Sequence, residues 1–163
     1  MAYTLLTHSE SETEALGRAL GRRLQPGDVV ALVGDLGAGK TCLARGIAAG
    51  LGVEEPVASP TFILVAEYPT APGFPLYHAD CYRLDNPARE AEDIGLDELM
   101  ADHGAVVVEW ADRVEALLPA DHLRVTLEIV DDHCRRITLE PSGPRAGQLL
   151  AGLLDGSQTG PEG

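Results

Sequence analysis

Cysteine is scarce in this sequence of 163 residues, which contains three of them. They are Cys42, Cys81 and Cys134, and no two of them have the short C-x-x-C spacing of a metal site. An odd number of widely separated cysteines also excludes a small scaffold held together by disulfide bonds. We therefore expect three free thiols in a reducing compartment.

Basic residues are also few. Lysine and arginine together number 12, against 26 aspartates and glutamates, which gives a net charge of −14. A negative field of this size repels the phosphate backbone of nucleic acids. The composition therefore argues against a protein that binds DNA or RNA on its own.

Long apolar runs are missing as well. Apolar stretches such as residues 29–33 and 105–108 are far shorter than the roughly 20 residues that a membrane helix needs. The N-terminus lacks the basic start and apolar run of a signal peptide. We expect a cytoplasmic protein without membrane contact.

The length predicts one compact domain, and a hydrophobic content of 45% is enough to build its core. We place this domain at residues 1–155. Residues 156–163 carry no large apolar side chain that could anchor them, so we expect a disordered tail there.

Two hydrophobic patterns indicate a mixed sheet. The unbroken apolar run 29–33 is typical of a central strand covered on both faces. Alternation over 123–129, resuming at Ile137 and Leu139, predicts an antiparallel hairpin with one wet face. Further strands are expected at 3–6, 62–68, 76–81 and 105–108, and helices after Ser9 or Ser11, through 43–47, from 86–87, near 97–100, and over 111–118 and 145–154.

Residues 34–41 read Gly-Asp-Leu-Gly-Ala-Gly-Lys-Thr and match the phosphate-binding pattern G-x-x-x-x-G-K-[ST]. In this loop, backbone N–H groups surround phosphates, the lysine reaches the β and γ phosphates, and the hydroxyl binds magnesium. The lysine is Lys40, the only one in the chain. The candidate nucleotide contacts are Asp35, Leu36, Gly37, Ala38, Gly39, Lys40, Thr41 and Cys42.

The strand before this loop and the helix after it predict the fold. We expect an α/β protein with a three-layer, P-loop NTPase-like architecture. Its central sheet is expected to be mixed and mainly parallel, with antiparallel hairpins at the edges. ATP is favoured over GTP, because the only asparagine, Asn86, precedes a proline and cannot begin the N-K-x-D loop that recognises guanine.

Two acids are candidates for the magnesium ligand and for the group that orients the attacking water. Glu109 follows the apolar strand 105–108 directly. Asp80 shares one strand face with Leu76 and His78 by period-two alternation. The residues by themselves leave the two roles open between these acids.

Three further residues have open roles. Thr61 lies twenty residues after Thr41, a placement like that of the switch threonine in other P-loop NTPases. We assign His78 no catalytic role, because nothing around it has metal-ligand spacing, and a packed, hydrogen-bonded histidine is the simpler interpretation. Trp110, the only tryptophan, belongs either to the core or to the surroundings of the nucleotide.

Four segments together resemble the TsaE family. They are Gly-Asp-Leu-Gly-Ala-Gly-Lys-Thr at 34–41, Ser-Pro-Thr-Phe at 59–62, His-Ala-Asp-Cys-Tyr-Arg at 78–83 and Glu-Trp at 109–110. The resemblance implies a small ATPase that binds ATP and Mg²⁺ and assists the synthesis of threonylcarbamoyladenosine beside the anticodon of tRNA. It also implies that the chain acts with the TsaB and TsaD proteins, of which TsaD performs the transfer, and meets tRNA only through the complex.

The resemblance also implies residue roles. Carried over by motif, Lys40 is the phosphate lysine, Thr41 and Glu109 are the magnesium ligands, and Asp80 is a catalytic acid on the γ-phosphate side. Lys40, Asp80 and Glu109 are thus the expected catalytic residues. The chain departs from the family pattern at Cys42, where a second threonine is usual, although the backbone N–H of Cys42 can still reach the α-phosphate.

No arginine stands in an obvious position to complete the γ-phosphate site. Arg83, Arg113 and Arg136 are the candidates, and Arg136 is also a candidate nucleotide contact. We expect slow hydrolysis by the chain alone and faster hydrolysis with its partners. The alternatives are a small P-loop kinase that phosphorylates a metabolite, which would need an acceptor pocket and a lid, and a nucleotide-sensing module without meaningful hydrolysis.

Overall fold

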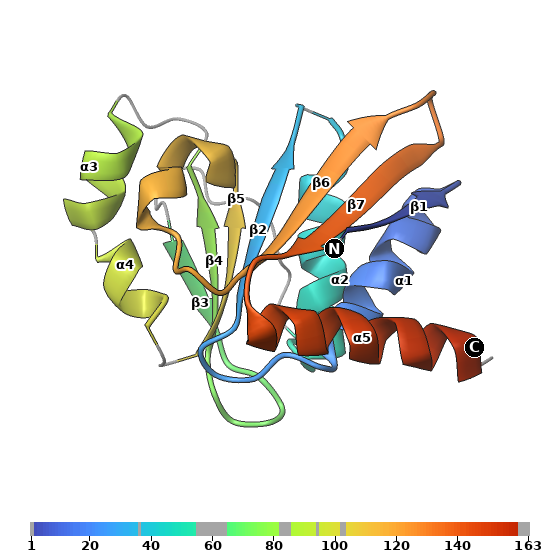
Figure 1. Cartoon of the computed structure of the whole chain (residues 1–163). Coiled ribbons are helices and arrows are strands. Elements are labelled where there is room, and N and C mark those ends of the chain that lie inside the picture. Colours follow the sequence, from blue (N-terminus) through green and yellow to red (C-terminus); the bar gives the residue numbers. More distant parts are fainter. Residues whose placement is uncertain are drawn as a thin grey trace.

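The fold is known from a computed structural model that describes residues 2–35, 37–54, 65–81, 86–93, 95–101 and 104–159. Within these residues the strands form one seven-stranded sheet in the order β1-β7-β6-β2-β5-β4-β3, with helices on both faces (Figure 1). The elements are, in chain order, β1 (Tyr3–Thr7), α1 (Glu10–Gly21), β2 (Val29–Gly34), α2 (Lys40–Gly50), β3 (Val65–Tyr68), β4 (Leu76–Asp80), α3 (Pro87–Asp93), α4 (Leu96–Leu99), β5 (Ala105–Glu109), the 3₁₀ helix η1 (Ala111–Leu117), β6 (Leu123–Ile129), β7 (Arg135–Pro141) and α5 (Pro144–Thr159).

The centre of the sheet is parallel and its edges are antiparallel. β2 pairs in parallel with both β5 and β6, and β4 pairs in parallel with β5. The hairpins β3–β4 and β6–β7 and the pairing of β1 with β7 are antiparallel. β2 is central because its apolar side chains are buried on both faces. The predicted α/β class and the mixed sheet are therefore confirmed.

Two apolar clusters lie on the two faces of the sheet. One joins the sheet to α1, α2 and α5 through side chains such as Leu20, Ile47 and Leu150. The other joins it to α4 and η1 through side chains such as Leu96 and Val114. The sheet is thus the middle of three layers, and its parallel strands all end at the edge where α2 begins.

Helices α1 and α2 approach each other closely because glycines line their contact. A Cβ at Gly17 would overlap the carbonyl oxygen of Leu43, and one at Gly46 would overlap the carbonyl oxygen of Glu14. Of the two serines considered as a cap for α1, Ser9 has this role, since its hydroxyl accepts the N–H of Glu12 at 3.1 Å. The start of α1 lies beside the start of α2, where the Cys42 thiol donates to the carbonyl oxygen of Glu10.

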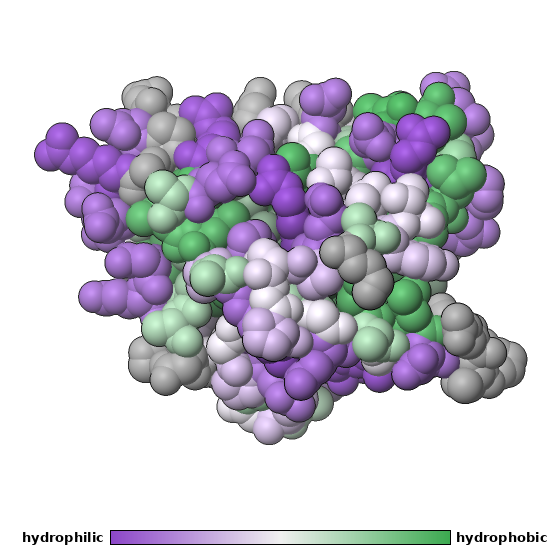
Figure 2. All heavy atoms as spheres, viewed as in Figure 1, coloured by the Kyte–Doolittle hydropathy of each residue, from purple (hydrophilic) through white to green (hydrophobic). Residues whose placement is uncertain are grey.

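The solvent-exposed face predicted for the hairpin β6–β7 is present. Arg124, Thr126, Arg136 and Thr138 alternate with buried neighbours and remain at least partly exposed. In the view of Figure 2, hydrophilic residues cover much of the surface and apolar residues form smaller separate groups. None of the described helices combines the length and apolar content needed to cross a membrane.

The structure differs from the sequence-based expectations at the C-terminus. Helix α5 continues to Thr159 and so includes the first four residues of the segment that we expected to be disordered. Residues 160–163, and residues 62–64 of the strand expected at 62–68, lie outside the described residues. All three cysteines are described and all are free, as expected.

Candidate nucleotide-binding site

The loop 34–41 connects the central strand β2 to the N-terminus of α2. Gly37 and Gly39 have φ values of 83° and 105°, which L side chains rarely adopt, so the loop needs glycine at both positions. The unpaired N–H groups of a helix N-terminus and its dipole favour bound anions. The backbone is thus shaped to receive phosphate groups.

Lys40 is buried at the start of α2, with 5% of its surface exposed. Its ammonium group donates hydrogen bonds to the carbonyl oxygens of Gly34, at 2.6 Å, and Asp35, at 2.8 Å. Burial lowers the pKa of Lys40, and nearby carboxylates, of which Glu109 contributes most, oppose this lowering. The loop therefore holds a cation near its own carbonyl groups.

Glu109 lies at the end of β5 and contacts two other strongly polar side chains. The Thr41 hydroxyl donates to its two carboxylate oxygens, at 3.1 Å and 3.3 Å. His78 Nε2 lies 2.6 Å from Glu109 Oε2. Glu109 is 2% exposed, so these contacts fix its carboxylate in a largely water-free position.

Asp80 lies directly beside this carboxylate in the sheet. The parallel register of β4 and β5 pairs Asp80 with Glu109 and His78 with Val107. Leu76 and His78 are buried, whereas Asp80, at the strand end, is half-buried. The two candidate acids thus share one edge of the sheet, which faces the phosphate loop.

The oxygen atoms at this edge of the sheet are suitable ligands for magnesium. Mg²⁺ prefers hard oxygen ligands and is commonly held by one or two side chains together with substrate phosphates. The Thr41 hydroxyl and the Glu109 carboxylate are such oxygen donors and already lie within hydrogen-bonding distance of each other. Among the described residues no group of three or more His, Cys, Asp and Glu forms a metal site, so phosphate oxygens would have to complete the coordination.

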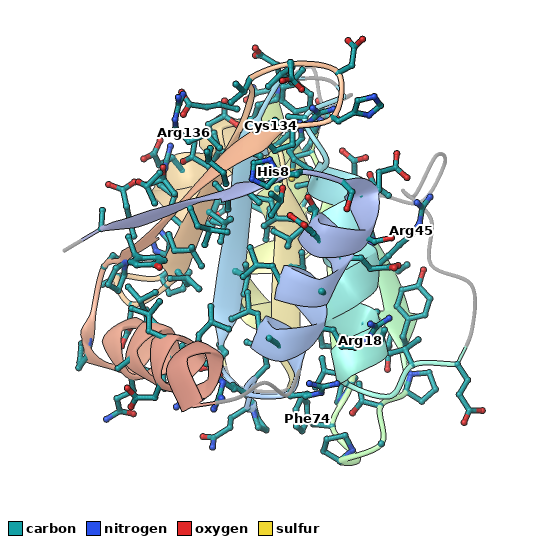
Figure 3. The ribbon with its side chains drawn as sticks, turned by 90° about the vertical axis from the view of Figure 1, so that its right-hand side faces the viewer. His8, Arg18, Arg45, Phe74, Cys134 and Arg136 are labelled. Atoms are coloured by element: carbon teal, nitrogen blue, oxygen red, sulfur yellow. The ribbon has the colours of Figure 1, made fainter. Side chains whose placement is uncertain are left out.

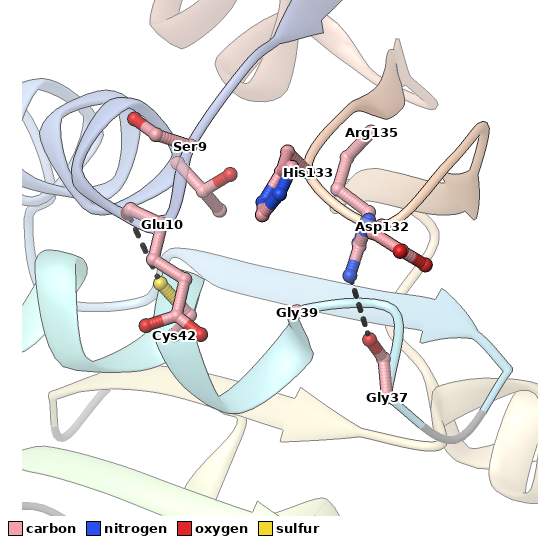
Figure 4. Close-up of a pocket in the computed structure, with 9 residues that line it drawn as sticks. Ser9, Glu10, Gly37, Gly39, Cys42, Asp132, His133 and Arg135 are labelled. Atoms are coloured by element: carbon pink, nitrogen blue, oxygen red, sulfur yellow. Dashed lines mark hydrogen bonds between the residues drawn. The ribbon is translucent and has the colours of Figure 1, made fainter.

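A cavity of about 300 Å³ lies on the other side of the loop (Figure 4). Its lining residues come from the start of α1, the phosphate loop and α2, and the β6–β7 turn: Ser9, Glu10, Thr13, Gly37, Gly39, Cys42, Asp132, His133 and Arg135. Arg135 donates to the carbonyl oxygen of Gly37 at 3.3 Å, and the Cys42 thiol donates to that of Glu10 at 3.3 Å. A pocket of this size and polarity can hold the base and ribose of a nucleotide.

Arg136, the arginine that the sequence analysis places at the nucleotide, lies elsewhere. Successive residues of a strand point to opposite faces, and Arg136 is exposed on the side of the sheet away from α2, 3.8 Å from Glu128 (Figure 3). Its neighbour Arg135 reaches the loop instead. Arg135 therefore replaces Arg136 as the candidate contact, because the register of the hairpin selects it.

Most of the other predicted site residues lie around the loop. Lys40, Thr41, Glu109 and Asp80 come together, and Cys42 lines the cavity, whereas Leu36, Thr61 and Arg83 lie outside the described residues. Trp110 packs against the core, as one of its two interpretations expected, and its ring also lies against Lys40. That it borders a bound nucleotide stays a prediction. His78 is buried and hydrogen-bonded, as the sequence analysis expected, although its partner Glu109 was not predicted. Arg135 was missed, although period-two alternation through Ile137 could have pointed to it.

Comparisons with known proteins identify a family. The model of the family described as threonylcarbamoyl adenosine biosynthesis protein TsaE matches residues 7–137. The tRNA threonylcarbamoyladenosine biosynthesis protein TsaE of Bacillus subtilis is 42% identical over 147 residues, which is 90% of each chain. The protein of that name from Mycobacterium tuberculosis is 45% identical over 133 residues, which is 77% of this chain and 79% of the relative.

A solved structure extends the likeness to three dimensions. The crystal structure of YdiB from Bacillus subtilis superposes with a TM-score of 0.82 at 35% identity and covers 96% of this chain and 97% of its own. The two chains are therefore similar in sequence and in fold over most of their lengths. Since the family match includes the phosphate loop, both acids and Arg135, this chain belongs to the TsaE family of threonylcarbamoyl adenosine biosynthesis proteins.

Proposed function

We propose that this protein is the ATP-binding and ATP-hydrolysing subunit that assists threonylcarbamoyl transfer to adenosine beside the anticodon of tRNA, acting in the cytoplasm with TsaB and TsaD. Membership of the TsaE family supports the pathway. The observation that carries the ATPase activity is the contact between Thr41 and Glu109 at the end of the phosphate loop. This contact joins the hydroxyl of the phosphate-binding motif to the buried carboxylate of Glu109 at the end of β5.

Nucleotide binding uses both sides of the loop. The N–H groups of the loop and Lys40 would bind the phosphates, which replace the carbonyl groups that now accept from the ammonium. The cavity beside Cys42 and Arg135 would hold the nucleoside. Arg135 adds a positive charge next to the loop of a strongly acidic protein.

Hydrolysis would use the edge formed by β4 and β5. Thr41 and Glu109 would hold Mg²⁺, which when bound neutralises charge that develops on the transferred phosphoryl group. Asp80 lies beside Glu109 and is more exposed, so it is the acid that can reach a water molecule. Asp80 would orient that water for attack on the γ-phosphate and accept its proton.

Partner proteins would set the rate. Positive groups supplied by a partner raise phosphoryl-transfer rates by roughly 10³ to 10⁵ in well-studied P-loop proteins. A net charge of −14 leaves contact with tRNA to TsaB and TsaD. We therefore expect slow turnover of ATP by this protein alone and a large increase in the complex.

The test measures single-turnover ATP hydrolysis by the full chain alone, with TsaB, with TsaD and with both. We expect a large increase with both partners that Asp80→Asn removes. Arg124→Ala is the matched control, since Arg124 pairs with Glu115 on the surface far from the loop in sequence, and it should retain the increase. Equal rates with and without partners would contradict partner stimulation, and phosphate transfer to an added metabolite would favour a kinase.

A further inference from the structure

His78 and Glu109 form a buried pair that links two parallel strands. Their side chains lie on the same face of β4 and β5, and His78 Nε2 is 2.6 Å from Glu109 Oε2. His78 is 1% exposed and Glu109 is 2% exposed. A bond this short between buried groups is strong because little water competes for either partner.

The two carboxylate oxygens of Glu109 accept different hydrogen bonds. Oε2 accepts from His78, and the single hydroxyl proton of Thr41 is shared between Oε1, at 3.1 Å, and Oε2, at 3.3 Å. Each carboxylate oxygen has two lone pairs. Among the described groups, His78 is therefore the donor that contacts Oε2 alone, and at least one lone pair on Oε1 stays available.

Of the two ring nitrogens of His78, Nε2 has a hydrogen-bond partner among the described residues. In the part of the chain that the structure describes, the buried Nδ1 has no hydrogen-bond partner. An unsatisfied buried polar atom destabilises the folded protein, and an apolar side chain of similar size would avoid this cost. The polar contact that offsets this cost is the one from Nε2 to Glu109.

We propose that His78 is a positioning residue: its Nε2–H group holds Oε2 of Glu109 so that Oε1 is oriented for magnesium before the nucleotide binds. This inference rests on the proposed function, in which Glu109 is a magnesium ligand. Mg²⁺ requires near-ideal octahedral geometry, so a ligand that rotates binds it less well. Loss of a group that orients a metal ligand typically reduces metal affinity by about 10- to 100-fold.

The experiment measures the affinity of a non-hydrolysable ATP analogue by calorimetry, with Mg²⁺ and with EDTA. His78→Gln places an amide N–H near the position of Nε2, whereas His78→Asn places one near Nδ1. We expect Asn to reduce the strengthening of binding by Mg²⁺ by about 10- to 100-fold. The affinity in EDTA should stay unchanged, and Gln should keep most of the Mg²⁺ effect.

A second measurement does not depend on whether the His78 variants fold. Nitrogen NMR of the wild-type protein without nucleotide should show the His78 proton on Nε2, with signals assigned by substituting the other four histidines in turn. A proton on Nδ1 alone, equal losses in the Gln and Asn variants, or the same loss in EDTA would each overturn the positioning role. A wild-type protein that binds no nucleotide would instead contradict the proposed function, and the NMR result would still test the hydrogen bond.

Discussion

The ammonium nitrogen of Lys40 lies 4.0 Å from the centre of the Trp110 ring. The lysine is thus held by an aromatic face and by two loop carbonyl groups. Trp110 itself has a φ of 58°, the one positive value among the described residues other than glycine. A bound phosphate would compete for the ammonium group, so we expect nucleotide binding to change the surroundings of this tryptophan.

The first prediction concerns Lys40 and uses this contact. Lys40→Ala should weaken ATP binding by about 100-fold or more, because hydrogen bonds to charged groups contribute about 1.5–3 kcal/mol each. The fluorescence of Trp110, the only tryptophan, should change when ATP is added to the wild type and stay constant in the variant. Thermal unfolding without nucleotide should show that the variant is folded, and an unfolded variant would contradict a purely phosphate-binding role.

The second prediction separates two adjacent arginines. Arg135→Ala should weaken ATP binding by about 10-fold, since it removes a charge that contacts the loop at Gly37. Arg136→Ala removes the same charge from the opposite face of β7 and is the matched control. Calorimetric titration of both variants checks this, and a larger loss in Arg136→Ala would restore the sequence-based assignment.

The third prediction concerns the reactivity of Cys42. Burial, with help from the carboxylates of Glu10 and Glu14, raises its pKa above the ordinary value of 9.0. Because the thiolate is the reactive form, alkylation by iodoacetamide should be slow at neutral pH and accelerate as the pH rises through the raised pKa. Cys42 lines the proposed nucleoside cavity, so ATP should protect it.

Mass spectrometry of labelled peptides measures this reaction site by site. Cys81 and Cys134 are buried, and burial raises the pKa of Cys81 to about 12, so both should react more slowly than Cys42. Cys42→Ser is the control that removes the fast site. Labelling of Cys42 at the same rate with and without saturating ATP would place the nucleoside outside this cavity.

The fourth prediction tests the contact between α1 and α2. Gly46→Ala should destabilise the fold by about 3 kcal/mol, because the added methyl group would overlap the backbone of α1 at Glu14. Gly147→Ala in α5 is the matched control: its Cβ meets no atom within 4 Å, so it should stabilise by about 0.5–1 kcal/mol through helix propensity. Urea unfolding of both variants gives the two changes, and equal changes would refute a close helix contact.

The sequence by itself determined the features that depend on neighbouring residues. The loop 34–41 is a contiguous motif, so its glycines, Lys40 and Thr41 could be identified without a fold. The apolar run of β2 indicated a central strand because burial on both faces requires apolar side chains at every position. Glu109 could be found because it ends such a run.

The tertiary structure decided which distant residues meet. The His78–Glu109 contact joins residues 31 apart in the chain and exists because β4 and β5 pair in one parallel register. The cavity beside Cys42 required the packing of α1 against α2 and the position of the β6–β7 turn. Arg135 rather than Arg136 reaches the loop because a strand directs alternate side chains to opposite faces, and hairpin pairing fixes which face meets α2.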